Sequence, residues 1–243
     1  MESLAEKSVS VLSPQVLALL KEQPKALLFD LDGTLIDSVP DLAAAIDVML
    51  TSVGRQPAGV DKVVRWVGNG APALVKRALA DDDDGDLIDF ADDEFNQAYQ
   101  IFEFAYAKRL HEATGLYPGV VETLARLSDF KLALITNKPR QFTLPLLESL
   151  QITHYFQCII CGDDYERKKP DPMPVIEALK SLRVSAEQAL MVGDSVSDIK
   201  AAQAAGVATV AMTYGYNHGV AIKEAQSKAG LYLDEFAGLL DAI

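Results

Sequence analysis

Short apolar runs, each as long as one β-strand, recur along this chain of 243 residues and alternate with amphipathic helical patterns. The six runs are Ala26–Phe29, Lys131–Thr136, Gln157–Cys161, Ala189–Val192, Val207–Met212 and Leu231–Leu233. Continuous apolar runs of this length are typical of strands buried on both faces, as in a parallel sheet covered by helices. Their alternation with helices predicts an α/β fold with a doubly wound, Rossmann-like parallel sheet.

Helical patterns separate the later runs. They occupy Val120–Leu127, Phe142–Leu150, Pro174–Leu182 and Asp198–Ala205. Pro174 suits the first turn of a helix, and Gly206 suits the left-handed residue that follows one.

The interval between the first and second runs, from Gly33 to Lys131, is far longer than one crossover helix requires. Its middle shows only helical patterns: Leu42–Leu50, Val60–Val67, Ala71–Leu79 and a long helix through Phe95, Tyr99, Phe102 and Tyr106. We therefore expect an α/β core over residues 25–40 and 111–243, with a helical cap over residues 41–110 inserted after the first strand. Residues 1–24 are expected to form a helical extension.

Composition excludes several classes of protein. With 49% hydrophobic and 23% charged residues, the chain is neither disordered nor collagen-like. Its 22 Lys and Arg against 35 Asp and Glu give a net charge of −13, which repels a phosphate backbone and argues against a nucleic-acid partner. An anionic substrate can bind only where local cations, a metal ion or oriented N–H groups outweigh that charge.

Cysteine content and the N-terminal sequence bear on the compartment. Cys158 and Cys161 are too few for a disulfide scaffold, and without a second pair they favour strand residues over a zinc or redox site. Residues 1–24 lack the pattern of a signal peptide, and no apolar run approaches the roughly 20 residues of a membrane span. We expect a cytoplasmic monomer or homodimer with no membrane partner.

Two aspartates follow the first predicted strand. Asp30 and Asp32 precede Gly33, which permits a tight backbone course. Ligands of open α/β sheets gather at the carboxyl ends of strands, whereas two like charges so close together repel each other. Taken alone, this pattern is as compatible with a capping Asp followed by a turn Asp as with a functional pair of carboxylates.

Three further segments place polar groups at the same edge of the sheet: Thr136–Lys138, Lys168–Pro170 and Gly193–Asp198. Dense carboxylates need a cation, and oxygen ligands alone favour a hard ion such as Mg²⁺. Mg²⁺ with a lysine and a hydroxyl–amide pair neutralises a phosphoryl group. A remaining aspartate can then serve as nucleophile or as general acid and base.

These segments resemble the four signature motifs of the haloacid dehalogenase superfamily of aspartyl-phosphate phosphohydrolases, and the resemblance extends over residues 25–243. The motifs are Asp30-Leu-Asp-Gly-Thr-Leu, Thr136-Asn-Lys, Lys169-Pro and Gly193-Asp-Ser-Val-Ser-Asp. Within the superfamily, three more segments are similar to the bacterial phosphoglycolate phosphatase family: Asp37-Ser38-Val39-Pro40-Asp41-Leu42, Trp66-Val67-Gly68-Asn69-Gly70 and Tyr214-Gly215-Tyr216-Asn217.

The resemblance implies a role for each carboxylate. Asp30 would attack phosphorus and become the aspartyl-phosphate, and Asp32 would protonate the leaving alkoxide and then activate water. Mg²⁺ would be held by the Asp30 carboxylate, the Asp32 carbonyl and Asp194, while Asp198 would orient a water on the ion.

The resemblance also implies phosphate ligands. Thr136 and the backbone N–H of Asn137 would bind phosphate oxygens, and Lys169 would pair with both nucleophile and phosphate. Lys168 is the rival for that last role, although the Lys-Pro pairing favours Lys169.

Several cap residues have two interpretations. Gly68, Asn69 and Gly70 are expected to form a substrate-facing loop, with an ordinary interhelix turn as the alternative. Arg65 suits either a substrate carboxylate or solvent, Trp66 is expected in the cap core, and His218 lies either near the site mouth or in a plain loop. The acidic residues 81–86 lack EF-hand spacing and are expected to form a solvated loop.

The predicted function is Mg²⁺-dependent hydrolysis of a small phosphate monoester, with 2-phosphoglycolate as the substrate. A phosphatase or mutase for a sugar phosphate and, in another class, a non-catalytic binding module are the alternatives. A degenerate module should have lost at least one of four residues, yet all are present: Asp30, Asp32, Lys169 and Asp194.

Overall fold

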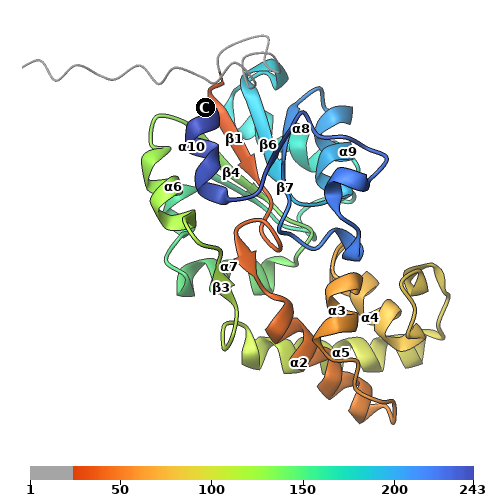
Figure 1. Ribbon diagram of the computed structural model, residues 1–243. Helices are drawn as coiled ribbons and strands as arrows, with labels where there is room; N and C mark the ends of the chain where they lie inside the picture. Colours follow the sequence, from red (N-terminus) through yellow and green to blue (C-terminus); the bar gives the residue numbers. More distant parts are fainter. Residues whose placement is uncertain (1–23) are drawn as a thin grey trace, which may run out of the picture.

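The computed structural model describes residues 24–243, so the helical extension expected over residues 1–24 lies, apart from Pro24, outside the described residues. A six-stranded parallel sheet forms its centre, in the order β5-β4-β1-β6-β7-β8 (Figure 1). The strands are β1 (Ala26–Phe29), β4 (Lys131–Ile135), β5 (Cys158–Ile160), β6 (Ala189–Gly193), β7 (Ala208–Met212) and β8 (Leu231–Leu233). Each corresponds to one predicted apolar run, and the predicted α/β fold is confirmed.

The central strand β1 is buried on both faces. Leu27 and Phe29 belong to one hydrophobic cluster, to which α6 (Val120–Arg126), α7 (Arg140–Ser149) and α10 (Leu239–Ala242) contribute. Ala26 and Leu28 belong to a second cluster, which α8 (Met173–Leu182) and α9 (Val196–Ala204) cover. Helices on both faces explain why the strand sequences are apolar without alternation.

The strand order reverses at β1. After β1 the chain reaches β4 and β5 on one side and then returns to β6, β7 and β8 on the other. Phe29, the last residue of β1, is in register with Leu134 of β4 and Val192 of β6. The carboxyl ends of these three strands therefore meet, and ligands of open α/β sheets bind at such a reversal.

Four α-helices occupy residues 39–109 and lie beyond the carboxyl end of β1, towards which its arrowhead points in Figure 1. They are α2 (Val39–Ser52), α3 (Val60–Trp66), α4 (Ala71–Ala80) and α5 (Asp92–Arg109). Trp66, Phe102 and Tyr106 are buried among them. We call residues 41–110 the cap, as above.

Two short strands connect the cap to the sheet. β2 (Ile36–Asp37) and β3 (Gly115–Leu116) pair in antiparallel fashion, with Ile36 opposite Leu116. No pattern in the sequence predicts these strands, because two residues are too few to show a period. The pair ties together the two chain segments that join core and cap.

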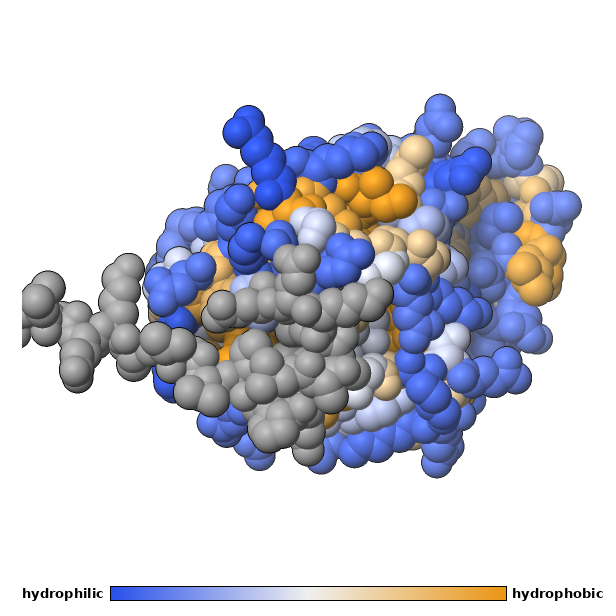
Figure 2. Space-filling view, turned by 90° about the horizontal axis from the view of Figure 1, so that it is seen from above, coloured by the Kyte–Doolittle hydropathy of each residue, from blue (hydrophilic) through white to orange (hydrophobic). Residues whose placement is uncertain are grey.

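Single turns of 3-10 helix complete the described chain: η1 (Gly85–Leu87), η2 (Thr153–Tyr155), η3 (Ala186–Gln188), η4 (Asn217–Gly219), η5 (Ile222–Glu224) and η6 (Phe236–Gly238). From residue 24 to residue 243, no helix has both the length and the apolar character needed to cross a membrane. In the view of Figure 2, hydrophilic side chains surround smaller hydrophobic patches on the surface not drawn in grey.

Candidate active site

Three buried carboxylates converge where β1 and β6 end. Asp30 follows β1, Asp194 follows β6, and Asp198 lies in the first turn of α9. One oxygen from each lies within 4.8 Å of the others, and within residues 24–243 this is the only group of three or more such acidic, histidine or cysteine side chains. Residues 164 positions apart therefore share one site because their strands are neighbours.

Lys169 lies at the centre of this cluster. Its Nζ is 2.7 Å from Asp30 Oδ1 and 2.6 Å from Asp198 Oδ1, and it donates to the Ile135 carbonyl at 2.6 Å. Burial lowers the pKa of Lys169, but the Asp198 and Asp30 carboxylates outweigh it and the net shift is upward, so the ammonium stays charged. The rival Lys168 lies elsewhere, beside Gly70 of the cap.

One ammonium among three carboxylates leaves the cluster with unbalanced negative charge. Burial raises the pKa of Asp30 well above its ordinary value, with further contributions from Asp198 and Asp194, while Lys169 opposes the rise. Burial, then the charge of Asp198, raises the pKa of Asp194 to about 7. A buried set of oxygen donors with excess negative charge fits a hard divalent cation.

The hydrogen bonds of the three carboxylates show which of them could bind a metal ion directly and which supports its neighbours. Asp198 uses both oxygens within the protein: Oδ1 pairs with Lys169, and Oδ2 accepts from the N–H and the hydroxyl of Ser195 at 3.0 and 2.6 Å. This capping box fixes Asp198 at the start of α9. Asp30 and Asp194 are better placed to bind an ion directly, since each has oxygen lone pairs that no described group uses.

Two glycines bring backbone against Asp194. A Cβ added at Gly33, where φ is 85°, would lie 2.4 Å from Asp194 Oδ2, and one at Gly215 would lie 2.1 Å from Asp194 Cβ. Either contact is too short for a real side chain. Asp194 is further held by Thr34, whose hydroxyl donates to Oδ1 at 3.0 Å, and by the Tyr216 N–H, which donates to Oδ2 at 2.8 Å.

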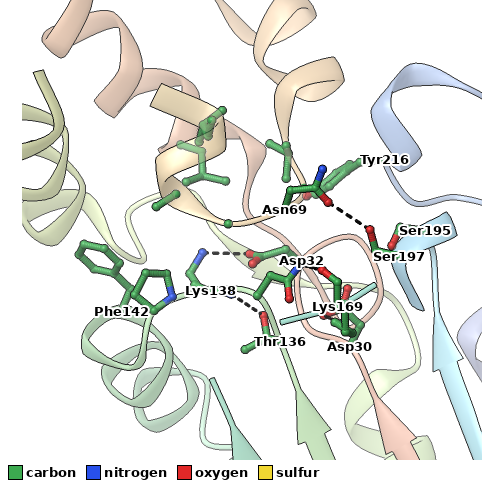
Figure 3. A pocket seen from close by; sticks show the side chains of 18 of the residues that line it. Asp30, Asp32, Asn69, Thr136, Lys138, Phe142, Lys169, Ser195, Ser197 and Tyr216 are labelled. Carbon is green, nitrogen blue, oxygen red and sulfur yellow. Dashed lines mark hydrogen bonds and ion pairs between the residues drawn. The ribbon is translucent and has the colours of Figure 1, made fainter. Parts of the chain in front are cut away.

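Asp32 has different partners from Asp30. Its Oδ1 accepts a hydrogen bond from the Ser38 hydroxyl and forms an ion pair of 3.0 Å with Lys138 Nζ (Figure 3). Lys138 is 6% exposed and lies over the ring of Tyr106. Lys138 belongs to the Thr136-Asn-Lys motif, but the sequence indicates no role for it. Its partner Asp32 is 106 positions away, and only the fold brings the two together.

A cavity lies between the core and the cap, and Asp30, Asp32 and Lys169 line it. Thr136 and Asn137 line the same cavity. Thr136 Oγ1 accepts from the Lys138 N–H at 3.1 Å, which leaves its own hydrogen available to a phosphate oxygen. The Asn137 side chain donates to the Lys169 carbonyl at 2.9 Å and so fixes the loop that carries the buried lysine.

The cap loop of Gly68, Asn69 and Gly70 faces the core. All three residues have positive φ, at 128°, 59° and 86°. Asn69 Oδ1 accepts from the Ser197 hydroxyl at 3.1 Å, and a Cβ at Gly70 would lie 2.9 Å from the Asn137 carbonyl oxygen. The loop lines the cavity and closes it from the cap side (Figure 3).

Three further residues singled out from the sequence, Arg65 and Trp66 of the cap and His218 of the core, do not line the cavity. Arg65 forms an ion pair with Asp83 at 3.4 Å and is half exposed. Trp66 is buried and donates to Asp83 at 2.9 Å. His218 packs its ring against Gly68. Residues 81–86 are mostly exposed, as expected, although Asp86 pairs with the buried guanidinium of Arg77 at 3.0 Å.

Tyr216 connects the acidic cluster to the start of the cap. Its hydroxyl donates to Asp37 Oδ1 at 2.6 Å and accepts from the Ser38 N–H at 2.8 Å. Its backbone N–H holds Asp194, and Ser38 in turn holds Asp32. The segments 37–42 and 214–217 were both noted in the sequence, but their contact was not foreseen.

Comparison with known proteins agrees with this geometry. A model of the haloacid dehalogenase-like hydrolases matches residues 27–212. A phosphoglycolate phosphatase of Pseudomonas savastanoi pv. phaseolicola is 50% identical over 219 residues, covering 89% of this chain and 79% of the relative. A phosphoglycolate phosphatase of Nitrosococcus oceani is 45% identical over 207 residues, covering 84% and 91%.

A crystal structure described as a predicted phosphoglycolate phosphatase from Haemophilus somnus 129pt superposes with a TM-score of 0.84 at 38% identity. The superposition covers 91% of this chain and 98% of that one. The family model spans most of the chain and includes the four motif segments at Asp30, Thr136, Lys169 and Gly193. The chain therefore belongs to the haloacid dehalogenase-like hydrolase family.

Proposed function

We propose that this protein hydrolyses 2-phosphoglycolate to glycolate and phosphate, through a covalent aspartyl-phosphate on Asp30 and with Mg²⁺ as cofactor. The substrate is supported by the names of relatives, one of which is 50% identical to this chain over 219 residues. The mechanism is supported above all by one observation: Asp30, Asp194 and Asp198 converge at one site, where the buried ammonium of Lys169 pairs with Asp30 and Asp198. In the following steps, every residue that would touch the substrate lines the cavity.

In the first step, an Asp30 carboxylate oxygen attacks phosphorus and the bond between phosphorus and the glycolate oxygen breaks. Two anions must approach each other, and the charge of Lys169, 2.7 Å from Asp30, reduces their repulsion. Thr136 donates its hydroxyl hydrogen to a phosphate oxygen. Asp32 gives a proton to the departing alkoxide, which is a poor leaving group without one.

In the second step, Asp32 takes a proton from a water molecule that attacks the phosphorus of the aspartyl-phosphate. The bond between Asp30 and phosphorus breaks, so Asp30 returns as a carboxylate and inorganic phosphate is released. Ser38 and Lys138 hold the Asp32 side chain in one orientation, which both proton transfers require.

The Asp30 and Asp194 carboxylates and the Asp32 carbonyl would hold Mg²⁺ in this proposal. When bound, the ion supplies positive charge for the phosphoryl oxygens and for the attacking carboxylate. Asp198 would position other groups and not bind the ion directly, because its two oxygens hold Lys169 and the first turn of α9.

The cap would exclude bulk water during these steps. Its loop at residues 68–70 lies against the core and limits the room beside the cluster. A small ester such as 2-phosphoglycolate suits this closed arrangement.

The proposal is tested by phosphate release from the purified full-length chain. We expect Mg²⁺-dependent turnover with a higher kcat/KM for 2-phosphoglycolate than for hexose phosphates, an amino-sugar phosphate or nucleoside monophosphates. Chelation should abolish it. A preference for sugar phosphates would overturn the substrate, and turnover without a divalent cation would overturn the proposed cofactor.

A cytoplasmic location and a monomeric or homodimeric state stay predictions. The location rests on the low cysteine content, and the described cysteines Cys158 and Cys161 are both free thiols. Light scattering of the purified chain measures the assembly state directly.

A further inference from the structure

The cavity is lined by two chemically different sets of side chains. Asp30, Asp194 and Lys169 form one set, whereas the other is mainly apolar: Leu42, Leu74, Phe102, Tyr106 and Phe142. The substrate proposed above carries two anionic groups, a phosphate and a carboxylate, joined by one methylene group. If the phosphate lies against Asp30, the carboxylate must lie within the same cavity, and an apolar wall alone would disfavour it.

Lys169 cannot serve the second anion. A lysine ammonium has three hydrogens, and Lys169 directs them at three oxygens, those of Asp30, Asp198 and Ile135. All three contacts are between 2.6 and 2.7 Å. No hydrogen of the Lys169 ammonium therefore remains for the carboxylate of the substrate.

Lys138 is the other cation that lines the cavity. Its Nζ contacts Asp32 Oδ1 at 3.0 Å and lies 4.8 Å from the centre of the Tyr106 ring. The bond to Asp32 uses one of the three ammonium hydrogens, so donors remain for an anion. Lys138 is 6% exposed, which strengthens its attraction for a negative group.

The hydroxyl of Tyr106 is an unused donor beside Lys138. Tyr106 is 1% exposed, and its hydroxyl hydrogen has no acceptor among residues 24–243, because the neighbouring Lys138 ammonium can only donate. A buried donor without an acceptor is unfavourable and calls for an explanation at a native site. Burial raises the pKa of Tyr106 to about 12, so the group is a neutral donor at physiological pH.

Packing holds the Tyr106 ring in place. The ring is stacked on Phe102, with centroids 5.6 Å apart, and meets Phe142 edge-on at 5.0 Å. Phe142 belongs to α7 of the core, whereas Tyr106 belongs to α5 of the cap. The donor is therefore brought to Lys138 only when cap and core are packed together.

We propose that Lys138 and the Tyr106 hydroxyl form the subsite that binds the carboxylate of the substrate, and so determine specificity for a phosphate ester with a second acidic group. This inference rests on the proposed function and names how the same site selects its substrate. A carboxylate accepts hydrogen bonds only, which matches two donors set in an otherwise apolar wall. A sugar, with donors and acceptors on every carbon, would leave donors of its own unsatisfied there.

The test compares two substrates of similar length. These are 2-phosphoglycolate and 2-hydroxyethyl phosphate, in which a neutral hydroxymethyl group replaces the carboxylate. We define the selectivity as the ratio of kcat/KM for the first to kcat/KM for the second, measured with Mg²⁺. Tyr106→Phe should lower this ratio roughly tenfold or more, since it removes a hydrogen bond to a charged group. Lys138→Met should lower it further.

Tyr99→Phe is the matched control. Tyr99 lies on the same helix, two turns before Tyr106, and does not line the cavity. Tyr99 is stacked on Phe95 and contacts Phe102 at a tilt, so its substitution removes a tyrosine hydroxyl from the same aromatic row and should leave the ratio unchanged. If Lys138→Met fails to fold, Tyr106→Phe still decides the question.

A second measurement separates failure of this inference from failure of the proposed function. Glycolate binding, followed by titration calorimetry with Mg²⁺ present, should weaken at least about fivefold in Tyr106→Phe and stay unchanged in Tyr99→Phe. If Tyr106→Phe lowers kcat/KM equally for both substrates and leaves the glycolate affinity unchanged, the carboxylate subsite is overturned. The hydrolysis of 2-phosphoglycolate would still stand in that case. A wild-type protein that turns over neither substrate would refute the proposed function, and glycolate binding would then judge the subsite alone.

Discussion

Ser197 of the core donates its hydroxyl hydrogen to Asn69 of the cap, with 3.1 Å between Oγ and Oδ1. Ser197 lies in the first turn of α9, whose capping box also fixes Asp198. Asn69 has φ of 59° and sits between two glycines, which are residue types that adopt left-handed backbone readily, so the loop can turn sharply against the core. This bond therefore links closure of the cap to the helix that positions the acidic cluster.

Removing that bond should favour the open cap. Ser197→Ala is expected to raise KM for 2-phosphoglycolate about fivefold, corresponding to the roughly 1 kcal/mol of one hydrogen bond. Amide hydrogen exchange in residues 68–71 should become faster. Ser52→Ala, which removes a hydroxyl bonded to the Val48 carbonyl at the exposed end of α2, is the control. Unchanged exchange and KM in Ser197→Ala would mean that other contacts hold the cap.

Asp30→Asn should abolish turnover while the fold persists. The amide cannot attack phosphorus, and we expect kcat to fall by at least about 10³-fold. Burial and the neighbouring carboxylates disfavour the charged form of Asp30, so removing its charge should leave the melting temperature without metal equal to or above that of the wild type. Lys169 keeps Asp198 as its counter-ion. Circular dichroism and a phosphate-release assay check both expectations, and substantial residual turnover would contradict the nucleophile assignment.

The metal-free protein should lose stability as pH rises. The pKa of Asp194 is raised from an ordinary value of 3.8 to about 7, so between about pH 4 and pH 7 the folded state binds more protons than the unfolded state. Stability without metal is then greatest at the acidic end of that window and declines towards pH 7. Thermal melts in the presence of a chelator measure this.

Mg²⁺ should reverse that trend, because it binds the deprotonated carboxylates. The rise in melting temperature on adding Mg²⁺ should be larger at pH 8 than at pH 6. Asp194→Asn should lose this response at both pH values. A Mg²⁺ response that is equal at pH 6 and pH 8 would argue against binding at this cluster.

Gly215→Ala should displace Asp194. A methyl group there would lie 2.1 Å from Asp194 Cβ, so one of the two segments must move. We expect destabilisation of about 1–3 kcal/mol and a loss of most of the Mg²⁺-induced stabilisation. Gly238→Ala is the matched control, because its nearest neighbour would be Leu233 Cδ2 at an ordinary 3.6 Å, and it should change stability by less than about 0.5 kcal/mol. Normal metal response in Gly215→Ala would show that Asp194 tolerates the shift.

Local patterns predicted the elements of this fold well, because each depends on side chains close together in the sequence. The run Ala26–Phe29 is apolar at every position since both faces of β1 are covered, and Pro174 and Gly206 mark the start of α8 and the turn after α9. The pair β2 and β3 was not predicted, because its two strands are only two residues long and are separated by the whole cap.

Which site residues contact one another depends on the three-dimensional packing of the chain and not on their neighbours in the sequence. The sequence offered Lys168 and Lys169 as alternatives, and only the packed structure shows Lys169 between Asp30 and Asp198. It gave no signal that Lys138 contacts Asp32, nor that the Tyr106 hydroxyl lies without an acceptor beside the same lysine.

By itself, the sequence determined that this chain forms a parallel sheet with a helical insertion, and that aspartates, a lysine and a hydroxyl stand at the ends of its strands. Those properties follow from apolar periodicity and from motifs of adjacent residues, which involve little loop closure. The tertiary structure decided which oxygen each ammonium faces, how Ser38 and Tyr216 join the two sides of the site, and where the cap loop meets the core. These contacts join residues more than a hundred positions apart in several cases, and they exist only because strand order and helix packing bring the segments together.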